Sequence, residues 1–571
     1  MSQGNADQAR LIIGELVRCG INEFVIAPGF RSAPLALAVA SHPSAQVTIH
    51  FDERGSAFFA LGYGRATRKP CVWITTSGTA VANGLPAVVE SAMDEVPLIC
   101  LTADRPPELR DTGANQTIDQ VHIFGRYPKW FADLPAPTAE QDASFIRTTI
   151  DYAVHRALSG GPVHLNCMFR EPLLEKKDKD HSIPAIPWAT EGLPGTLYQT
   201  EAKSTVILDD GLLQKISSAQ RGLIVSGRLQ TLEEAEAISV LANYLGWPLI
   251  ADICAPVSTT ENSVNFFDLI VRNKPFVQKH QPDLVLHFGG PLVSKELQNF
   301  LANSPSKVYV AISPSDGRID PRHTVTDRVQ STIVGFCDGL LNVPSDNPSR
   351  RAWLDAWMRA DTAVRHTLSD VLQKHLSEPS LAWILSDLLD STNWMFGANS
   401  MPIRDLQTFF RRDQNASRVF ANRGASGIDG TLATVAGIAK AQSGYGTVLL
   451  GDLAMLHDVN SLSLLKERDV IIVVINNNGG GIFHMLPIAL GHEEFEKVLG
   501  TPHGMDFRWA TAQFQIPYSS VDSCEEFREI WQSAASSSGP YLIEVQTDRT
   551  QNAELHTALY RLVGKAIQST I

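Results

Sequence analysis

The chain has 571 residues, 44% of them hydrophobic and 19% charged, and a formal net charge of −13. At about 150 residues per domain this length predicts three or four domains, and the acidic balance argues against a nucleic-acid-binding protein, which needs a basic face. Seven scattered cysteines, none in Cys-x-x-Cys spacing, argue against a disulfide framework and a zinc site. Because a secretory signal and a bilayer-spanning apolar run are both missing, we expect a cytoplasmic protein without membrane insertion.

The first part of the chain alternates helical and strand patterns of apolar residues. The predicted elements, in order, are a helix over 8–20, a strand over 24–27, a helix over 57–67, a strand over 71–75, a helix over 80–93 and a strand over 98–101. Alternation of this kind predicts a parallel sheet with helices on both faces.

Two further units of the same kind follow, and stretches rich in charged residues, proline or turn formers at 174–187 and 343–348 predict linkers between the units. The predicted elements are strands over 223–225, 248–251, 284–288 and 308–312 and a helix over 232–245 in the second unit, then helices over 352–375 and 380–389 and strands over 448–450, 470–475 and 541–546 in the third. The expected fold class is therefore α/β, with three doubly wound parallel-sheet domains at 1–185, 200–345 and 352–571.

The segment from Gly451 to Phe483 carries the most informative pattern. Asp452 follows one predicted strand and Asn477 follows the next, twenty-five positions later, which is about one strand–helix–strand crossover. Both side chains are therefore expected at the sheet edge where α/β folds bind ligands. A carboxylate, an amide oxygen and a backbone carbonyl from the glycine turn suit Mg²⁺, which also accepts phosphate oxygens. Each motif alone is ordinary turn chemistry.

The run Asp52-Glu53-Arg54 stands directly ahead of a helical pattern rich in small and apolar residues. Acids that cap the helix and complement its dipole are the ordinary explanation for such a run. Glu53 indicates more than helix capping, because apolar residues adjoin the run on both sides. A half-buried carboxylate there suits proton exchange with a bound ligand.

Two other segments rich in small residues lack a nucleotide-binding pattern. Gly62-Tyr63-Gly64 lies inside a helical pattern without the full Gly-x-Gly-x-x-Gly spacing. Ser77 and Gly78 follow a strand, and their small side chains favour close backbone approach of a flat ligand. A tight packing turn without a ligand is about equally expected. A nucleophilic serine is not indicated because Gly-x-Ser-x-Gly is absent.

Basic residues stand in or beside the loops that follow the strands. A single arginine is usually a solvated surface residue. Several at strand ends of an acidic chain indicate a polyanionic substrate, because guanidinium groups bind carboxylates with two hydrogen bonds. The members of this set are Arg31, Arg105, Lys295, Arg404 and Arg423.

Together these motifs resemble thiamine-diphosphate-dependent enzymes. Gly451-Asp452 with Asn476-Asn477 is similar to their metal and diphosphate motif, and the Glu53 segment is similar to their glutamate region. Longer motifs resemble, within that family, the menaquinone-pathway synthases that join 2-oxoglutarate to isochorismate. These motifs are Ala27 to Ser32, Leu101 to Leu109, Gly113 to Gln116, His164 to Cys167, Asn399-Ser400 and Asn422 to Gly430.

The resemblance implies a role for each matching residue. The Mg²⁺ ligands would be Asp452, Asn477 and the carbonyl of Gly479, with Mn²⁺ as the alternative ion. The residues around thiamine diphosphate would be Glu53, Ser77, Gly78, Ile428, Gly451, Asp452, Leu453, Asn477, Gly479, Ile482 and Phe483. The substrate-binding residues would be Arg31, Arg105, Asn115, Gln116, Lys295, Asn399, Ser400, Arg404 and Arg423. Catalysis would rest on Glu53, Arg31, Gln116, Ser400 and Arg404.

The resemblance also implies the reaction and the assembly. The protein would be a transferase that decarboxylates 2-oxoglutarate and adds the resulting carbanion to isochorismate by conjugate addition, in menaquinone biosynthesis. Its three domains would be pyrimidine-binding, central and diphosphate-binding, in a homodimer or a dimer of dimers with active sites at the subunit interface.

Two alternatives remain open at this point. One is another thiamine-diphosphate-dependent 2-oxo-acid decarboxylase or carboligase, such as an acetohydroxyacid synthase relative, which would act on pyruvate and need few basic residues. The other is a non-catalytic protein that kept the fold. Two residues depart from the family pattern: Phe30 stands where Ser is typical, and Glu296 stands where some members have a basic residue.

Overall fold

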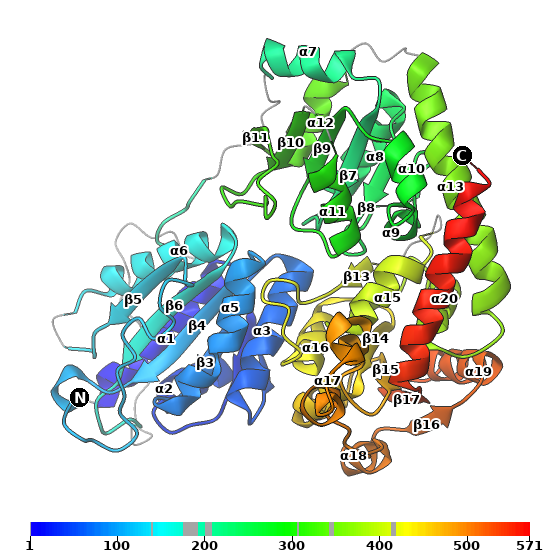
Figure 1. Cartoon of the computed structure of the whole chain (residues 1–571). Helices are drawn as coiled ribbons and strands as arrows, with labels where there is room; N and C mark the ends of the chain where they lie inside the picture. The colour runs from blue at the N-terminus through cyan, green and yellow to red at the C-terminus, as the bar shows by residue number, and fades with distance from the viewer. Residues whose placement is uncertain are drawn as a thin grey trace. The chain divides into compact units, whose positions relative to one another are not determined.

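The computed structural model describes residues 2–138, 141–174, 192–199, 208–257, 259–304, 306, 308–341, 348–412 and 418–570. Three parallel β-sheets with interleaved helices lie within these ranges (Figure 1), which confirms the predicted α/β fold class. The predicted linkers at 174–187 and 343–348 fall largely outside the described residues. The three predicted domain boundaries therefore remain predictions.

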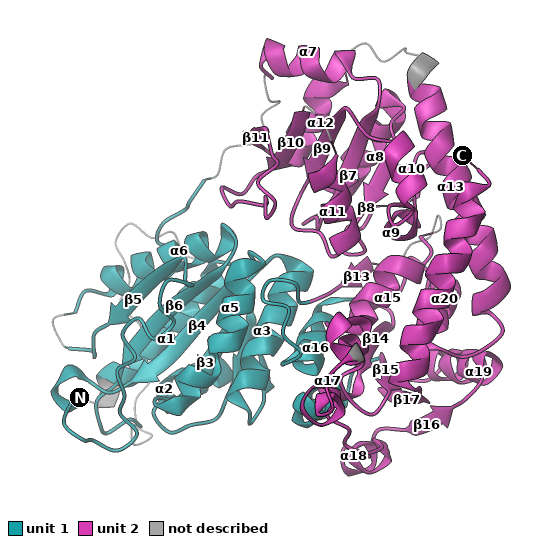
Figure 2. Ribbon diagram, viewed as in Figure 1, with its two compact units in different colours: residues 1–200, 422–443, 454–469 teal, residues 201–421, 444–453, 470–571 magenta. Residues whose placement is uncertain are grey.

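The chain forms two compact units, which Figure 2 colours separately. Unit 1 consists of Met1–Thr200, Asn422–Ser443 and Ala454–Asp469, and unit 2 consists of Glu201–Ala421, Gly444–Leu453 and Val470–Ile571. Two late segments of the chain thus belong to the first unit. No helix in the described ranges combines the length and the apolarity needed to cross a membrane.

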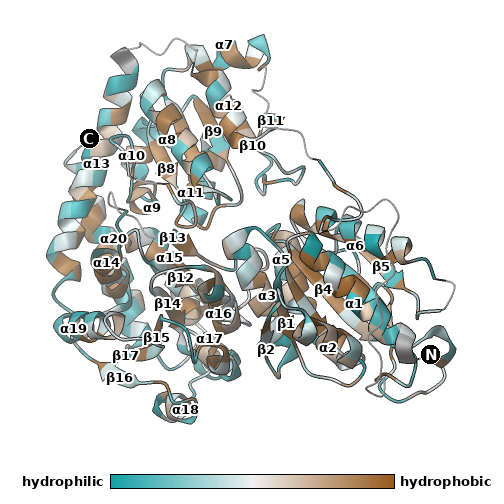
Figure 3. Cartoon of the chain, turned by 180° about the vertical axis from the view of Figure 1, so that it is seen from behind, coloured by the Kyte–Doolittle hydropathy of each residue, from teal (hydrophilic) through white to brown (hydrophobic). Residues whose placement is uncertain are grey.

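Unit 1 is built on one six-stranded parallel sheet with the order β2-β1-β3-β4-β6-β5. Its strands are β1 (Glu23–Ile26), β2 (Gln46–Ile49), β3 (Cys71–Thr75), β4 (Leu98–Asp104), β5 (Trp130–Leu134) and β6 (Pro162–Met168). Its helices are α1 (Ser2–Arg18), α2 (Ala33–Ser41), α3 (Glu53–Thr67), α4 (Thr79–Asn83), α5 (Leu85–Met93), α6 (Ala143–Leu158) and α16 (Thr431–Ala441), with 3₁₀ turns at Pro107–Leu109 and Val459–Leu464. Every residue of β3 and β4 is buried, because helices cover both faces of a parallel sheet, and β1 and β4 are coloured as hydrophobic in Figure 3.

Glycines allow α3 and α16 to pack at close range. A Cβ atom added to Gly62 would lie 2.1 Å from the carbonyl oxygen of Thr434, and one added to Gly437 would lie 2.0 Å from that of Phe59. Neither position can therefore carry a side chain without separating the helices. This contact explains Gly62 without a nucleotide, and Gly64 is explained by the carbonyl oxygen of Pro97, which would lie 2.3 Å from an added Cβ.

Unit 2 contains a five-stranded parallel sheet with the order β11-β10-β9-β7-β8. Its strands are β7 (Gly222–Ser226), β8 (Leu249–Ala251), β9 (Leu284–Phe288), β10 (Val308–Ser313) and β11 (Asp327–Gln330). The helices along this stretch are α7 (Asp210–Ser218), α8 (Leu232–Leu245), α9 (Phe267–Ile270), α10 (Lys274–Lys279), α11 (Lys295–Asn303) and α12 (Ile333–Leu340).

The second sheet of unit 2 has six parallel strands in the order β13-β12-β14-β15-β17-β16. Its strands are β12 (Trp394–Gly397), β13 (Arg418–Phe420), β14 (Gly446–Gly451), β15 (Val470–Asn476), β16 (Tyr518–Val521) and β17 (Tyr541–Gln546). The helices are α13 (Pro348–Leu372), α14 (Glu378–Leu388), α15 (Met401–Phe409), α18 (Arg508–Gln513), α19 (Cys524–Ala535) and α20 (Arg549–Gln568), with α17 (Asp452–His457) after β14 and short helical turns at Gly481–Met485, Pro487–Leu490 and Glu496–Gly500. The predicted crossover from β14 to the adjacent parallel strand β15 is confirmed.

Several element predictions are wrong in detail. The helix predicted over 80–93 is two helices that meet at Gly84, where an added Cβ would lie 2.2 Å from Cη2 of Trp73. Pro86 lies in the first turn of the second helix, which begins at Leu85, because proline fits a first turn but not a helix interior. The helix predicted from residue 57 begins at Glu53, since the Asp52 carboxylate caps it. Seven strands were not predicted: β2, β5, β6, β11, β12, β13 and β16.

Candidate active site

Three predicted substrate or ligand residues of unit 1 contact one another at the carboxyl ends of its strands. Ser77 follows β3 and Arg105 follows β4, and both side chains are buried. One guanidinium nitrogen of Arg105 donates to the Ser77 hydroxyl and to the carbonyl of Gln116, the latter at 2.6 Å. Gln116 Nε2 in turn donates to the carbonyl of Ser77 at 2.9 Å. The neighbouring Asn115 is exposed.

Arg31 brings a second buried guanidinium to the same part of unit 1. It follows β1, is 6% exposed, and donates to the carbonyl of Phe169 at 2.9 Å and to Glu171 Oε1 at 2.8 Å. Burial lowers the pKa of Arg105, and the positive charge of Arg31 lowers it further. A buried arginine whose pKa is lowered by a second cation favours an anionic ligand beside it.

Gln120 is a buried polar residue that the sequence did not indicate, and it connects the Ser77-Gly78 turn to β4 by hydrogen bonds. Gln120 Oε1 accepts from the amide of Gly78 at 3.0 Å, and its Nε2 donates to the carbonyl of Ala103 at 3.2 Å. Gly78 has a φ of 85°, a conformation that favours glycine. The Ser77-Gly78 segment is therefore a tight turn held by Gln120, and both predicted readings of it, close approach of a flat ligand and a packing turn without a ligand, stay predictions.

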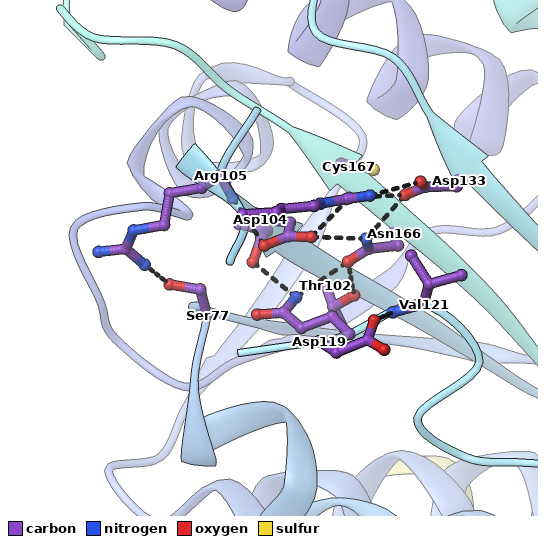
Figure 4. A network of polar contacts seen from close by, with 12 residues as sticks. Ser77, Thr102, Asp104, Arg105, Asp119, Val121, Asp133, Asn166 and Cys167 are labelled. Carbon is purple, nitrogen blue, oxygen red and sulfur yellow. Dashed lines mark hydrogen bonds and ion pairs between the residues drawn. The ribbon is translucent and has the colours of Figure 1, made fainter. Parts of the chain in front are cut away.

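Beneath the turn lies a network of buried polar groups (Figure 4). The Asn166 amide donates to Asp104 Oδ2 at 2.9 Å and to Asp133 Oδ1 at 2.8 Å, and its Oδ1 accepts from Thr102 at 3.0 Å. Arg110 neutralises both carboxylates. Such a satisfied network fixes the strand ends that carry Ser77 and Arg105, since each lost partner leaves a buried group unpaired.

His164 makes this network sensitive to acid. Burial lowers its pKa to about 3 from 6.5, so the folded chain stays unprotonated at this ring in the pH window where the unfolded chain binds a proton. Stability should therefore fall as the pH drops below about 6.5, by at most about 1.4 kcal/mol per pH unit from this group. Scanning calorimetry measures this effect: between about pH 7 and about pH 5.5, the Tm of His164→Gln should fall less steeply with falling pH than the Tm of wild type. The exposed-residue variant His375→Gln should not, and equal slopes for all three proteins would contradict this role.

Glu53 is the first residue of α3 and is partly buried. The capping prediction for this run is confirmed at its neighbour, since Asp52 Oδ1 accepts from the amides of Arg54 at 2.8 Å and Gly55 at 3.3 Å. Asn83 Nδ2 lies 3.4 Å from Glu53 Oε2. The glutamate side chain is thus free of a strong ion pair in the described part of unit 1 and stands at the positive end of a helix.

The loop that carries Arg423 and Ile428 is held by a buried carboxylate of α5. Glu90 accepts from the amides of Gly424 at 2.8 Å and Ala425 at 2.6 Å, and Arg65 donates to the same carboxylate at 3.1 Å. Burial and the nearby Asp94 raise the pKa of Glu90, whereas Arg65 opposes that shift. Arg423 and Ile428 are both partly exposed on this anchored loop.

Unit 2 brings the predicted metal ligands together. Asp452 follows β14 and is 2% exposed, and its Oδ2 accepts from the Gly479 amide at 2.8 Å. Its Oδ1 accepts from the Leu453 amide at 2.7 Å. Asn477 follows β15 and is 7% exposed. The predicted convergence of two strand ends is confirmed by the contact between Asp452 and the glycine turn.

The geometry of this turn fits a hard cation. Asn477 Nδ2 donates to Glu378 Oε1 at 2.9 Å, whereas Asn477 Oδ1 is buried and has no hydrogen-bond partner among the described residues. Gly479 has a φ of 137°, and an added Cβ would lie 1.9 Å from the carbonyl oxygen of Gly500. His503 Nε2 lies 3.1 Å from Asp452 Oδ2. An unpartnered amide oxygen beside a buried carboxylate is the oxygen-rich donor set that Mg²⁺ takes.

The other predicted residues of unit 2 occupy the surroundings. Asn399 and Ser400 follow β12, the neighbour of β14, and Ser400 has a φ of 75° and accepts from Arg404 through its carbonyl. Gly451 ends β14, and Ile482 and Phe483 lie partly buried in the turn at Gly481–Met485. Lys295 lies apart from this sheet, exposed at the start of α11 beside the five-stranded sheet. Glu296 next to it faces Arg272 at 3.5 Å.

Sequence reasoning missed the residues that support the predicted ones. Glu90, Gln120, Glu378 and His503 each hydrogen-bond a predicted residue or its loop, yet none stands in a strand-end motif. The sequence carried no signal for them: Glu378 follows Ser377 at a helix start, where an acid is ordinary capping chemistry, and only the structure shows that it is 1% exposed.

Comparison with protein families gives matches along most of the chain. Residues 7–123 match the thiamine pyrophosphate enzyme N-terminal TPP-binding domain, and residues 184–396 match the middle domain of thiamine pyrophosphate enzymes. Residues 402–545, which include Asp452 and Asn477, match the thiamine pyrophosphate enzyme C-terminal TPP-binding domain.

Individual relatives are similar over nearly their whole length. Proteins named 2-succinyl-5-enolpyruvyl-6-hydroxy-3-cyclohexene-1-carboxylate synthase are 45% identical in Salinibacter ruber (98% of this chain, 96% of the relative) and 45% identical in Rubrobacter xylanophilus (97% of each). One from Chlorobium phaeobacteroides is 40% identical over 98% of this chain and 97% of its own.

Proposed function

The chain belongs to the 2-succinyl-5-enolpyruvyl-6-hydroxy-3-cyclohexene-1-carboxylate synthase family of thiamine-diphosphate-dependent enzymes, and we propose that it decarboxylates 2-oxoglutarate and adds the resulting carbanion to isochorismate. Thiamine diphosphate, when bound, supplies a nucleophilic carbon and an electron sink for this chemistry. The residues of the chain bind, orient and control protons.

A divalent cation, Mg²⁺ or Mn²⁺, is proposed to join the cofactor diphosphate to unit 2. Asp452 would supply a carboxylate oxygen, Asn477 its Oδ1, and Gly479 its carbonyl. The unpartnered, buried Oδ1 of Asn477 is the observation that carries this proposal, because such an atom is costly unless a cation or a donor meets it. The side chains of Ile482 and Phe483 and the backbone of Gly451 and Leu453 would line the same place.

Glu53 is proposed to control proton exchange on the cofactor ring. A carboxylate in this place can hydrogen-bond the ring and exchange a proton with it. Ser77 and Gly78 would lie beside the ring in unit 1, and Ile428 would shape the cofactor from the anchored loop.

The basic residues are proposed to bind the substrates, both of which are dicarboxylates. Arg31 and Arg105 offer two buried guanidinium groups at one set of strand ends, with Gln116 and Asn115 beside them. The remaining proposed substrate residues are Lys295, Asn399, Ser400, Arg404 and Arg423. Because a pyruvate-specific enzyme has one carboxylate to bind, this number of cations favours the dicarboxylate reaction over the acetohydroxyacid synthase alternative.

The proposed assembly is a homodimer or a dimer of such dimers. In it, Glu53 of one copy of the chain and the Asp452 clamp of a second copy would serve the same cofactor. Each dimer would then hold two equivalent active sites, as closed two-fold symmetry requires.

The purified protein with thiamine diphosphate, Mg²⁺, 2-oxoglutarate and isochorismate tests this function. Isochorismate should disappear, one carbon dioxide should form for each isochorismate consumed, and omission of 2-oxoglutarate should stop both changes. Replacement of 2-oxoglutarate by pyruvate should leave little turnover. Absence of isochorismate consumption, or equal turnover with pyruvate, would remove the assignment.

Removal of the buried guanidinium of Arg105 tests substrate binding. Arg105→Met should lower kcat/KM for at least one of the two acids by about 10- to 100-fold, because a charge-assisted hydrogen bond contributes about 1.5–3 kcal/mol. Steady-state kinetics with each acid varied in turn measure this effect. The exposed arginine of the same unit provides the control Arg126→Met, which should behave as wild type. Unchanged kcat/KM for both acids in Arg105→Met would exclude the proposed contact.

A further inference from the structure

Asn477 can act as a metal ligand in only one of its two amide orientations. Its oxygen can coordinate a cation, whereas its Nδ2 carries two hydrogens and would repel one. Exchange of the two atoms is a rotation about one bond that leaves the shape of the side chain unchanged. Something in the fold must therefore select the orientation.

Glu378, the first residue of α14, contacts the amide of Asn477. Its Oε1 lies 2.9 Å from Asn477 Nδ2 and accepts a hydrogen bond from it. The flipped amide would place its oxygen against the carboxylate. The contact therefore points Nδ2 toward α14 and leaves Oδ1 free, as the absence of a partner for Oδ1 among the described residues indicates.

The carboxylate itself is held in place from a second side. The Thr547 hydroxyl, which follows β17, donates to the same Oε1 at 3.1 Å. Glu378 starts α14 and is 1% exposed, and the buried Asp405 stands on the helix that packs against α14. A buried carboxylate near a second acid lowers the stability of the fold. Packing therefore does not explain the presence of Glu378, and a functional role does.

We propose that Glu378 is a positioning residue that fixes the amide of Asn477 with its oxygen toward the cation. This inference rests on the proposed metal site. Groups of this kind, which orient a ligand without touching the metal, typically change metal affinity by about 10- to 100-fold when they are removed.

Two replacements of Glu378 separate orientation from charge. Glu378→Met removes the acceptor and lets the amide of Asn477 flip, so Mn²⁺ affinity in the presence of thiamine diphosphate should fall by about 10- to 100-fold. Glu378→Gln keeps a carbonyl oxygen that can accept from Nδ2, so it should retain most of the affinity. Electron paramagnetic resonance of free Mn²⁺ measures binding without any need for turnover.

The adjacent strand-end residue offers a matched control. Asn476 Nδ2 donates to the buried Glu544 at 2.7 Å, an asparagine–glutamate pair one position away from Asn477. Glu544→Met should leave Mn²⁺ affinity near that of wild type, because Asn476 is not a proposed ligand. Thermal unfolding of each variant without metal identifies any protein that has lost its fold.

The outcomes separate this inference from the proposed function. Wild-type protein that fails to bind Mn²⁺ with thiamine diphosphate would remove the metal site and, with it, the positioning role. If wild-type protein binds Mn²⁺, wild-type affinity in Glu378→Met, or equal losses in Glu378→Met and Glu378→Gln, would overturn the inference and leave the metal site standing. Equal losses in Glu544→Met and Glu378→Met would overturn it as well.

Discussion

Glu53→Gln is expected to lower kcat by at least about 100-fold, because proton transfer by a positioned side chain contributes about 10²–10⁴-fold to a rate. The substitution keeps the size of the side chain and its place at the start of α3 but removes the ability to exchange a proton. Among the described residues the carboxylate contacts only Asn83 Nδ2, at a long 3.4 Å, so the fold should be intact. Steady-state turnover together with thermal unfolding measures both effects.

The neighbouring acid provides the control for charge at the same helix end. Asp52→Asn removes one negative charge but keeps a good N-cap residue over the amides of Arg54 and Gly55. Its turnover should stay close to wild type. Near-normal turnover in Glu53→Gln, or an equal loss in both variants, would contradict a specific proton-exchange role for Glu53.

The second large effect is expected at the proposed metal clamp. Asp452→Asn removes the carboxylate ligand from a site where it is 2% exposed. Loss of one partner of a buried charge pair costs about 3 kcal/mol or more, so joint affinity for Mg²⁺ and thiamine diphosphate should fall by roughly 100-fold or more. Titration of the apoprotein with thiamine diphosphate, followed by tryptophan fluorescence at fixed Mg²⁺, measures this affinity.

An exposed acid of the same unit controls for charge alone. Asp506 accepts from the amide of Arg508 at 3.1 Å and is exposed, so Asp506→Asn should bind cofactor as wild type does. High Mg²⁺ should partly restore cofactor binding in Asp452→Asn, because weaker coordination is overcome by mass action. Wild-type cofactor affinity in Asp452→Asn would contradict the assignment of the clamp.

The parts of the site that follow strands could be predicted from the sequence. Asp452 and Asn477 each end an apolar run, and adjacent parallel strands place such ends at one edge of the sheet. The supporting residues could not be predicted, because they lie far away in the chain. Glu378 contacts Asn477 across 99 positions, and its burial depends on packing that no local pattern shows.

The fold follows the same division between local and long-range causes. The central strands β3 and β9 were predicted to the residue, since full burial leaves each of them mainly apolar. β6 was missed because buried polar residues, His164 and Asn166, interrupt its apolar pattern to serve the network beneath Arg105. The break at Gly84 depends on Trp73, a contact that the helical pattern does not contain.

The strand-end arginines differ in a way that sequence position did not indicate. Arg31 and Arg105 are buried and belong to unit 1, whereas Lys295 and Arg404 are exposed in unit 2. The buried pair has less freedom to lose when a carboxylate binds, so it should contribute more to substrate affinity than the exposed pair.

Glu53 of one copy of the chain and Asp452 of a second copy are proposed to serve one active site. Co-expression of Glu53→Gln and Asp452→Asn under different affinity tags tests this shared site most directly. The doubly tagged dimer should regain about half of the wild-type activity per dimer, because one of its two sites carries both substitutions and the other carries neither. A doubly tagged dimer no more active than the two parent variants would contradict the shared site.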